Sequence, residues 1–202
     1  MKTTLLILFL VPLLSQPSIS QNLIRNGSFE IGVPVPGNLP LGWNNCGALG
    51  ETATDIHSNQ TSAFGLRSVA ADGEQFVGMV VRDNNTQECL IHNFPETLLP
   101  GKYRLQFAAA VPDRYDSISR RNNRKDTYAR PVSVRILLRW EHDSVEAVAE
   151  VPRVIHRDWE YYDFELDITE TLYGIAFMPI YLSRAPYNGS VLIDDVSLIA
   201  ID

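Results

Sequence analysis

The feature that most constrains the fold is a series of short segments in which apolar and polar residues alternate, separated by turn residues. Val132, Val134, Ile136 and Leu138 occupy every second position, which is the period of a half-buried strand. No segment keeps a helical period over three turns. About ten strands at this spacing predict an antiparallel all-β sandwich or barrel, between which periodicity does not decide. The expected strands are Leu23–Phe29, Phe64–Ala70, Gln75–Arg82, Gln87–Phe94, Gly101–Ala110, Pro131–Trp140, Ser144–Val151, Trp159–Asp167, Leu172–Leu182 and Ser190–Ile201.

Two long connections interrupt this series, at residues 31–62 and 112–130. Loops of this length without secondary structure are uncommon and often functional or mobile. The second connection is locally basic, with Arg114, Arg120, Arg121, Arg124, Lys125 and Arg130 against Asp113, Asp116 and Asp126.

The first twenty residues form a separate segment. A basic start at Lys2, the apolar run Leu5–Leu14 and a polar exit with small residues are typical of a secretory signal peptide that ends before Gln21. The alternative is an uncleaved anchor, but the run is shorter than the roughly 20 residues that span a bilayer. We therefore expect one exported domain over residues 21–202 with no membrane span.

Net charge argues against one class of partner. The whole chain has a formal charge of −7, and removing residues 1–20 removes only Lys2, which gives −8. Phosphate contacts need a net basic face, so we expect no nucleic-acid partner.

Cys46 and Cys89 are the two cysteines. Exported chains sit in a compartment where disulfides persist, so one bridge between them is the simplest pairing. Neither has the spacing of a zinc or redox motif.

The two ends of the expected domain share a pattern with a known superfamily. Residues 22–30 read Asn-Leu-Ile-Arg-Asn-Gly-Ser-Phe-Glu, Gly42-Trp43 follows, and residues 191–199 read Val-Leu-Ile-Asp-Asp-Val-Ser-Leu-Ile. This pair resembles the carbohydrate-binding modules with the galactose-binding-like fold. The resemblance implies an antiparallel jelly-roll sandwich whose first and last strands lie close together. Fold alone does not give function, because lectins, adhesion domains and spacers share it.

The middle of the chain resembles a second group. The segment Phe76–Asn84 and the pattern Tyr115-x-Ser117-x-Ser119-Arg120 look like those of an uncharacterised family of exported bacterial domains, found at the N-terminus of cell-envelope proteins. This resemblance implies fold and an extracytoplasmic location, at the periplasm or cell surface, and supplies no activity.

The first resemblance also implies a metal. In many galactose-binding-like domains a structural calcium ion ties the end of the first strand to the last strand, and the matching carboxylates here are Glu30 and Asp194, with Asp195 as the alternative. Ca²⁺ takes several hard oxygen ligands, which suits carboxylates completed by loop carbonyls. The competing interpretation is that these carboxylates only accept backbone N–H bonds. If Asp194 shares a buried face with Leu192, Val196 and Leu198, it needs some such partner.

Sugar binding in this fold uses exposed aromatic rings and polar groups. Tyr115 and Tyr128, on either side of the basic connection, are candidates for a platform, although aromatic residues of strands are usually core. Tyr161 and Tyr162 are adjacent, so one of them must point outward. Further aromatic candidates are Trp140 and Trp159, whereas Trp43 is expected in the core.

Two polar patterns are weaker candidates. Arg120 and Arg121 could recognise an anionic glycan or cell-wall phosphate through the planar guanidinium, or belong to a solvated loop with internal Asp pairs. Asp55 and His57 would share one face of a strand, which allows a metal or acid–base pair or an ordinary hydrogen bond.

No nucleophile-elbow, zinc-protease, P-loop or dinucleotide motif is present. The sequence therefore predicts a non-catalytic domain that recognises a carbohydrate at the cell envelope or outside the cell. The alternatives are a protein–protein adhesion or assembly module of the envelope, and a small glycan hydrolase, which would need only two carboxylates.

Overall fold

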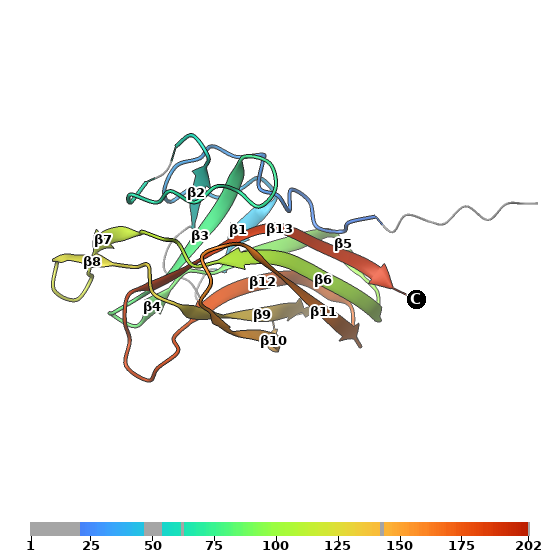
Figure 1. Cartoon of the computed structure of the whole chain (residues 1–202). Coiled ribbons are helices and arrows are strands. Elements are labelled where there is room, and N and C mark those ends of the chain that lie inside the picture. Colours follow the sequence, from blue (N-terminus) through green and yellow to red (C-terminus); the bar gives the residue numbers. More distant parts are fainter. Residues whose placement is uncertain (1–20, 47–53, 62, 142–143, 202) are drawn as a thin grey trace, which may run out of the picture.

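The computed structural model describes residues 21–46, 54–61, 63–141 and 144–201, and the expected signal peptide lies outside these ranges. Two antiparallel sheets pack face to face (Figure 1). The first, called here the β12 sheet, has the order β1 (Trp43–Asn45), β5 (Leu90–Leu98), β12 (Leu172–Ile180), β9 (Val132–Trp140) and β10 (Val145–Val154). The second, the β13 sheet, has the order β11 (Glu160–Ile168), β6 (Gly101–Ala110), β13 (Gly189–Ile201), β3 (Gln75–Arg82) and β2 (Asp55–Ser58), with β4 (Thr86–Gln87) on β3.

The all-β, antiparallel jelly-roll expectation is confirmed, and every strand pairing is antiparallel. Eight of the expected strands, from Gln75 onward, coincide with strands of the structure to within a few residues. No helix in the described part of the chain is long and apolar enough to cross a membrane.

The core lies between the sheets because the strands alternate as the sequence predicts. On β3, Val77, Met79 and Val81 point inward, and Val191 and Ile193 of β13 join them. Trp43 is buried in the same core, as expected. Burial of this many branched and aromatic side chains supplies most of the favourable free energy of folding.

The N-terminal segment Leu23–Phe29 is a turn, so the prediction of a strand there is wrong. Asn26 and Phe29 have φ angles of 53° and 58°, which extended strands do not adopt. Gly27 is required because a Cβ there would lie 1.9 Å from the carbonyl oxygen of Val196. The two ends still meet as expected, since Leu23 N donates to Leu198 O at 2.8 Å.

A register shift in β13 explains the two adjacent aspartates. The pairing of β13 with β6 is irregular between Asp194 and Ser197, and Asp195 has a φ of 46°. Asp194 therefore shares the outer face with Leu192, whereas Val196 and Leu198 turn into the core. The expectation that all four share one face is wrong, because a bulge reverses which side each later residue faces.

The segment Phe64–Ala70 is also not a strand. Phe64 and Gly65 have φ angles of 60° and 75°, and the chain there runs as a loop over the outer face of the β13 sheet. Phe64 and Leu66 pack in a second apolar cluster with Phe76 of β3. The loop thus covers a sheet face that would otherwise be exposed.

Each long connection contains short strands. Residues 31–62 include β1 and β2, and residues 112–130 form the hairpin of β7 (Asp116–Ile118) and β8 (Lys125–Thr127). The hairpin protrudes from one end of the sandwich (Figure 1). Its root is held to the body, because Asp116 N donates to Phe64 O at 2.8 Å and Ser190 Oγ donates to Tyr128 O at 2.7 Å.

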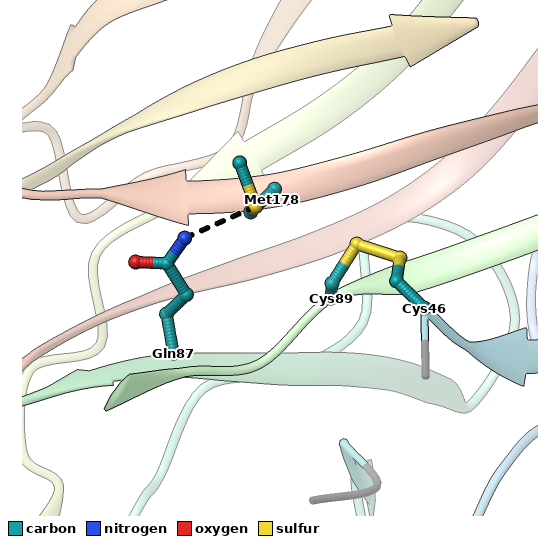
Figure 2. The surroundings of a disulfide bond; sticks show 4 residues. All are labelled: Cys46, Gln87, Cys89 and Met178. Carbon is teal, nitrogen blue, oxygen red and sulfur yellow. Dashed lines mark hydrogen bonds between the residues drawn. A yellow bond between two sulfur atoms is a disulfide. The ribbon is translucent and has the colours of Figure 1, made fainter. Parts of the chain in front are cut away.

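Cys46 and Cys89 form a disulfide on the outer face of the β12 sheet. Figure 2 shows the bridge beside Gln87, whose side-chain nitrogen donates to the sulfur of Met178 at 3.1 Å. The bridge joins residues 43 positions apart and contributes to a small apolar cluster with Ile91.

Candidate functional site

A pocket of about 400 Å³ lies over the outer face of the β13 sheet, where β2 and β3 meet the β7–β8 hairpin. Its charged lining consists of Asp55, Arg82, Glu88 and Arg120, and its aromatic lining of Phe64, Tyr115 and Tyr128. The volume is within the range of about 300–1,000 Å³ typical of ligand sites.

The wall nearest β3 is built around a gap in strand pairing. β2 pairs with β3 through Gly78 and β4 pairs with it from Val81, so Val80 between them has no strand partner on that edge. Glu88 fills the gap: its backbone N donates to Val80 O, and its carboxylate accepts the N–H of Val80 at 3.1 Å. The same carboxylate forms an ion pair with Arg82. Both side chains are more than 90% buried, so the charges lie inside the protein.

The opposite wall joins β2 to the hairpin. Tyr115 donates a hydrogen bond through its hydroxyl to Asp55, whose other carboxylate oxygen accepts the N–H of Gly37 at 2.8 Å. Burial, with the nearby carboxylates of Asp55 and Glu88, raises the pKa of the Tyr115 hydroxyl well above its usual value. The hydroxyl therefore stays protonated and remains a donor.

Phe64 forms a ridge between this pocket and a second hollow. Its ring stacks on Tyr115 with centroids 4.8 Å apart and planes 14° apart. The second hollow, of about 700 Å³, shares Phe64, Ser117 and Ile118 with the first and also contacts Lys125. The two hollows thus flank one aromatic side chain.

The tip of the hairpin is held in place by Asp83, which follows β3. Its carboxylate accepts hydrogen bonds from the Ser119 hydroxyl and, at 3.3 Å, from the backbone N–H of Arg121. Ser119 N donates in turn to Arg124 O at 2.8 Å. These bonds connect the basic turn to the rim of the sheet.

The predicted ligand-binding residues are only partly brought together. Tyr115 and Tyr128 are each 2% exposed, so the expectation that they form an exposed platform is wrong: the loop and hairpin cover them, and they line the pocket instead. Arg120 also lines the pocket, whereas Arg121 lines neither hollow. Tyr161 is 60% exposed on β11 and donates to Asp195 at 2.9 Å, apart from these residues.

Asp55 and His57 share a face of β2, as the alternation predicts, and both are buried. Neither ring nitrogen of His57 has a hydrogen-bond partner, and the ring stacks on Phe76. Burial lowers the pKa of His57, so the ring is neutral at pH 7.

The carboxylates expected to hold calcium have other partners. One oxygen of Glu30 accepts the N–H groups of Glu74 and Gln75 at 2.8 and 2.7 Å. The carboxylate of Asp194 accepts those of Ala71, Asp72 and Asp195. Among the described residues no group of three His, Cys, Asp or Glu side chains is placed to hold a metal ion. N–H donors repel a cation, so this arrangement does not fit one shared by Glu30 and Asp194.

Two pocket residues, Arg82 and Glu88, were not candidates from the sequence. The signal that could have found them is their position on either side of the turn Asp83–Asn85, where a hairpin brings an Arg and a Glu together. In the structure both lie in one pocket with Tyr115 and Tyr128 at the root of the hairpin, a long-range arrangement that sequence spacing does not reveal.

No family model and no curated protein matches the chain. Among solved structures it is similar to the CBM22-1 xylan-binding domain of Paenibacillus barcinonensis Xyn10C, at 10% identity and a TM-score of 0.56, over 91% of this chain and 96% of that one. It is also similar to the K2 cleaved adhesin domain of Lys-gingipain, at 11% identity and a TM-score of 0.54, over 92% and 99% of the two chains.

The enzymatically active domain of tailspike protein 4 of bacteriophage CBA120 is another similar structure, and this chain spans only about a fifth of its length. There the identity is 11%, the TM-score is 0.52, and 89% of this chain is covered. At these identities the three likenesses establish the fold. The chain is thus an all-β domain whose antiparallel jelly-roll sandwich is shared with these structures.

Proposed function

We propose that this chain is a non-catalytic carbohydrate-binding domain, and that it holds a sugar in the pocket between β3 and the β7–β8 hairpin. The observation that carries the proposal is the lining of that pocket: aromatic rings and charged hydrogen-bonding groups converge in a space of about 400 Å³. The fold shared with a xylan-binding domain supports the proposal.

The lining matches the two requirements of sugar recognition. A sugar ring presents apolar C–H faces, which stack on aromatic rings, and a rim of hydroxyls, which need donors and acceptors. Phe64 provides a partly exposed ring in the lining, and Arg120 and Ser117 provide polar groups. Because Asp55 and Glu88 are held by Tyr115 and Arg82, the pocket keeps its shape without ligand.

The test is polysaccharide affinity electrophoresis and calorimetry on the mature chain with Phe64→Ala and Ser117→Trp. The first variant removes the ring between the hollows, and the second fills the pocket without removing a charged partner. Each is expected to weaken binding about ten-fold or more, which is about 1.4 kcal/mol. Tyr161→Ala, on β11, is the control and also tests the platform expected from the sequence. Loss of affinity in Tyr161→Ala alone would place the sugar on β11 and overturn the pocket.

A glycan hydrolase is the alternative that the two buried carboxylates raise. Both carboxylates here have structural partners, Tyr115 for Asp55 and Arg82 for Glu88. The same samples should therefore release no reducing ends from any polysaccharide they bind. If reducing ends are released and Glu88→Gln abolishes that release, the chain is an enzyme.

A protein-binding module is favoured by a different observation. Ile31, Val33 and Leu41 are exposed in one loop, and Leu41 N donates to Ile31 O, which places two of the three side by side. Exposed apolar patches mark interaction sites. Replacing the three with serine should leave polysaccharide binding unchanged. If wild type self-associates or binds an envelope protein and the triple variant does not, this surface has its own role.

We extend the proposal to location: the signal peptide expected at residues 1–20 would export the domain to the cell envelope or beyond, where polysaccharides are present. A cleaved N-terminus at Gln21 in culture medium or periplasm tests this step.

A further inference from the structure

We propose that the sugar bound by this domain is anionic, a polysaccharide bearing carboxylate or sulfate groups, and that the basic turn of the β7–β8 hairpin selects it. This inference rests on the proposed function and adds the substrate class. The four cationic side chains of this turn, called the cation cluster, are Arg120, Arg121, Arg124 and Lys125.

The acidic residues of the hairpin are already paired with other cations. Arg114 pairs with Asp116 at 2.6 Å, and Arg130 pairs with Asp126 at 3.1 Å. The second oxygen of Asp126 accepts a hydrogen bond from Asn188 at 2.7 Å. Within the described part of the chain, none of the four cations of the cluster forms an ion pair. Their charge is therefore available to a partner.

The cluster is also placed at the site. Arg120 lines the pocket of about 400 Å³, and Lys125 lines the larger hollow on the far side of Phe64. A sugar chain that crosses Phe64 from one hollow to the other would pass a cation on each side. All four side chains are exposed, so their charged ends reach solvent and a ligand without desolvation beforehand.

The backbone of the turn is fixed, which makes the cluster a preorganised binding surface. Asn123 N donates to Ser119 O at 3.0 Å, Arg124 N donates to the side chain of Asn122 at 3.0 Å, and Asp83 holds Ser119 from the sheet. Two or more guanidinium groups on a fixed turn suit the planar carboxylate or sulfate of a glycan. The mature domain has a net charge of −8 including this cluster, so the part outside the four cations carries −12 and repels an acidic polymer.

The experiment measures affinity of the mature chain for polygalacturonate, a sulfated galactan and neutral xylan, at low and at physiological salt. The test variant replaces Arg120, Arg121, Arg124 and Lys125 with glutamine. Arg153→Gln/Arg184→Gln is the control, because it removes exposed cations outside the hairpin. Wild type is expected to bind at least one acidic polymer ten-fold or more tightly than xylan. The cluster variant should lose that preference, and Phe64→Ala should weaken binding of the same polymer.

The arms separate the outcomes. Preference for polygalacturonate identifies carboxylate as the recognised group, and preference for the sulfated polymer identifies sulfate. If wild type binds xylan tightly and the cluster variant binds it equally well, the inference that the ligand is anionic is wrong. The proposed sugar site is not contradicted by that result. An equal loss in the control variant, or binding indifferent to Phe64→Ala, would reduce the effect to general charge attraction and overturn the inference. A folded protein that binds none of the polymers would overturn both proposals.

Discussion

The outer faces of the two sheets bury side chains in different ways. On the β13 sheet, a loop and a hairpin cover Phe76, Val80 and Leu192, and the covered space encloses the Arg82–Glu88 pair. The outer face of the β12 sheet instead carries the disulfide beside Ile91, Leu137 and Met178. The ion pair between Arg135 of β9 and Glu150 of β10 is exposed to solvent on both sides. The same alternating strands thus give one face built for packing and one that holds polar groups in a pocket.

The largest expected difference between the faces is the strength of their ion pairs. Arg82→Met leaves Glu88 buried without its guanidinium partner, and should lower the free energy of unfolding by about 3–5 kcal/mol. Arg135→Met removes the cation of an exposed pair on the β12 sheet, with Glu150 at 3.4 Å, and should cost less than about 1 kcal/mol. Urea unfolding of both variants measures the difference. Equal costs would mean that the pocket charges are solvated.

The disulfide gives the converse comparison, because it stabilises the fold and lies away from the pocket. Cys46→Ala/Cys89→Ala should lower the free energy of unfolding by about 3–4 kcal/mol, since the bridge closes a loop between residues 43 positions apart. Polysaccharide affinity of the folded fraction should stay at the wild-type value. Mild reduction of wild type is the matched treatment. A ten-fold loss of affinity after either change would show that the two faces are coupled.

The pH dependence of stability should have opposite signs in the two sheets. His92, on β5, accepts the N–H of Arg25 at 3.1 Å, and burial lowers its pKa to about 4. As the pH falls, His92 therefore becomes protonated in the unfolded chain before it does in the folded chain. The free energy of unfolding decreases as pH drops from about 6.5 to 4, by up to about 3 kcal/mol. Burial raises the pKa of Asp194, on β13, to about 7, so its contribution to stability increases as pH drops from 7 toward 4.

Two variants separate these contributions. His92→Gln should flatten the loss of stability on the acid side, and Asp194→Asn should make that loss steeper, both read from urea midpoints between pH 4 and 7.5. The assignment fails if His92→Gln leaves the pH profile unchanged.

Alternation predicted the strands from Gln75 onward because inward and outward positions follow period two along each of them. It missed the turn at Asn26 and the bulge at Asp194, where the conformation depends on contacts between the chain ends, such as Gly27 against Val196. The pocket could not be predicted from alternation either, because the hydrogen bond between Tyr115 and Asp55 joins residues 60 positions apart. Tyr115 and Tyr128 were expected on an exposed platform and are buried instead, because the loop at Phe64 and the hairpin cover them.

The smallest expected effect concerns calcium, which the resemblance implies at Glu30 and Asp194. In the structure these two carboxylates hold opposite ends of one loop, Asp194 through Ala71 and Asp72 and Glu30 through Glu74 and Gln75. Backbone N–H groups thus satisfy the hydrogen-bonding capacity of these carboxylates, which a bound cation would otherwise neutralise. Thermal unfolding of the mature chain in EDTA and in millimolar calcium should therefore agree within about 1 °C, which is well below 1 kcal/mol. A rise of several degrees with calcium, lost in Glu30→Gln, would mean that the loop releases these carboxylates to an ion.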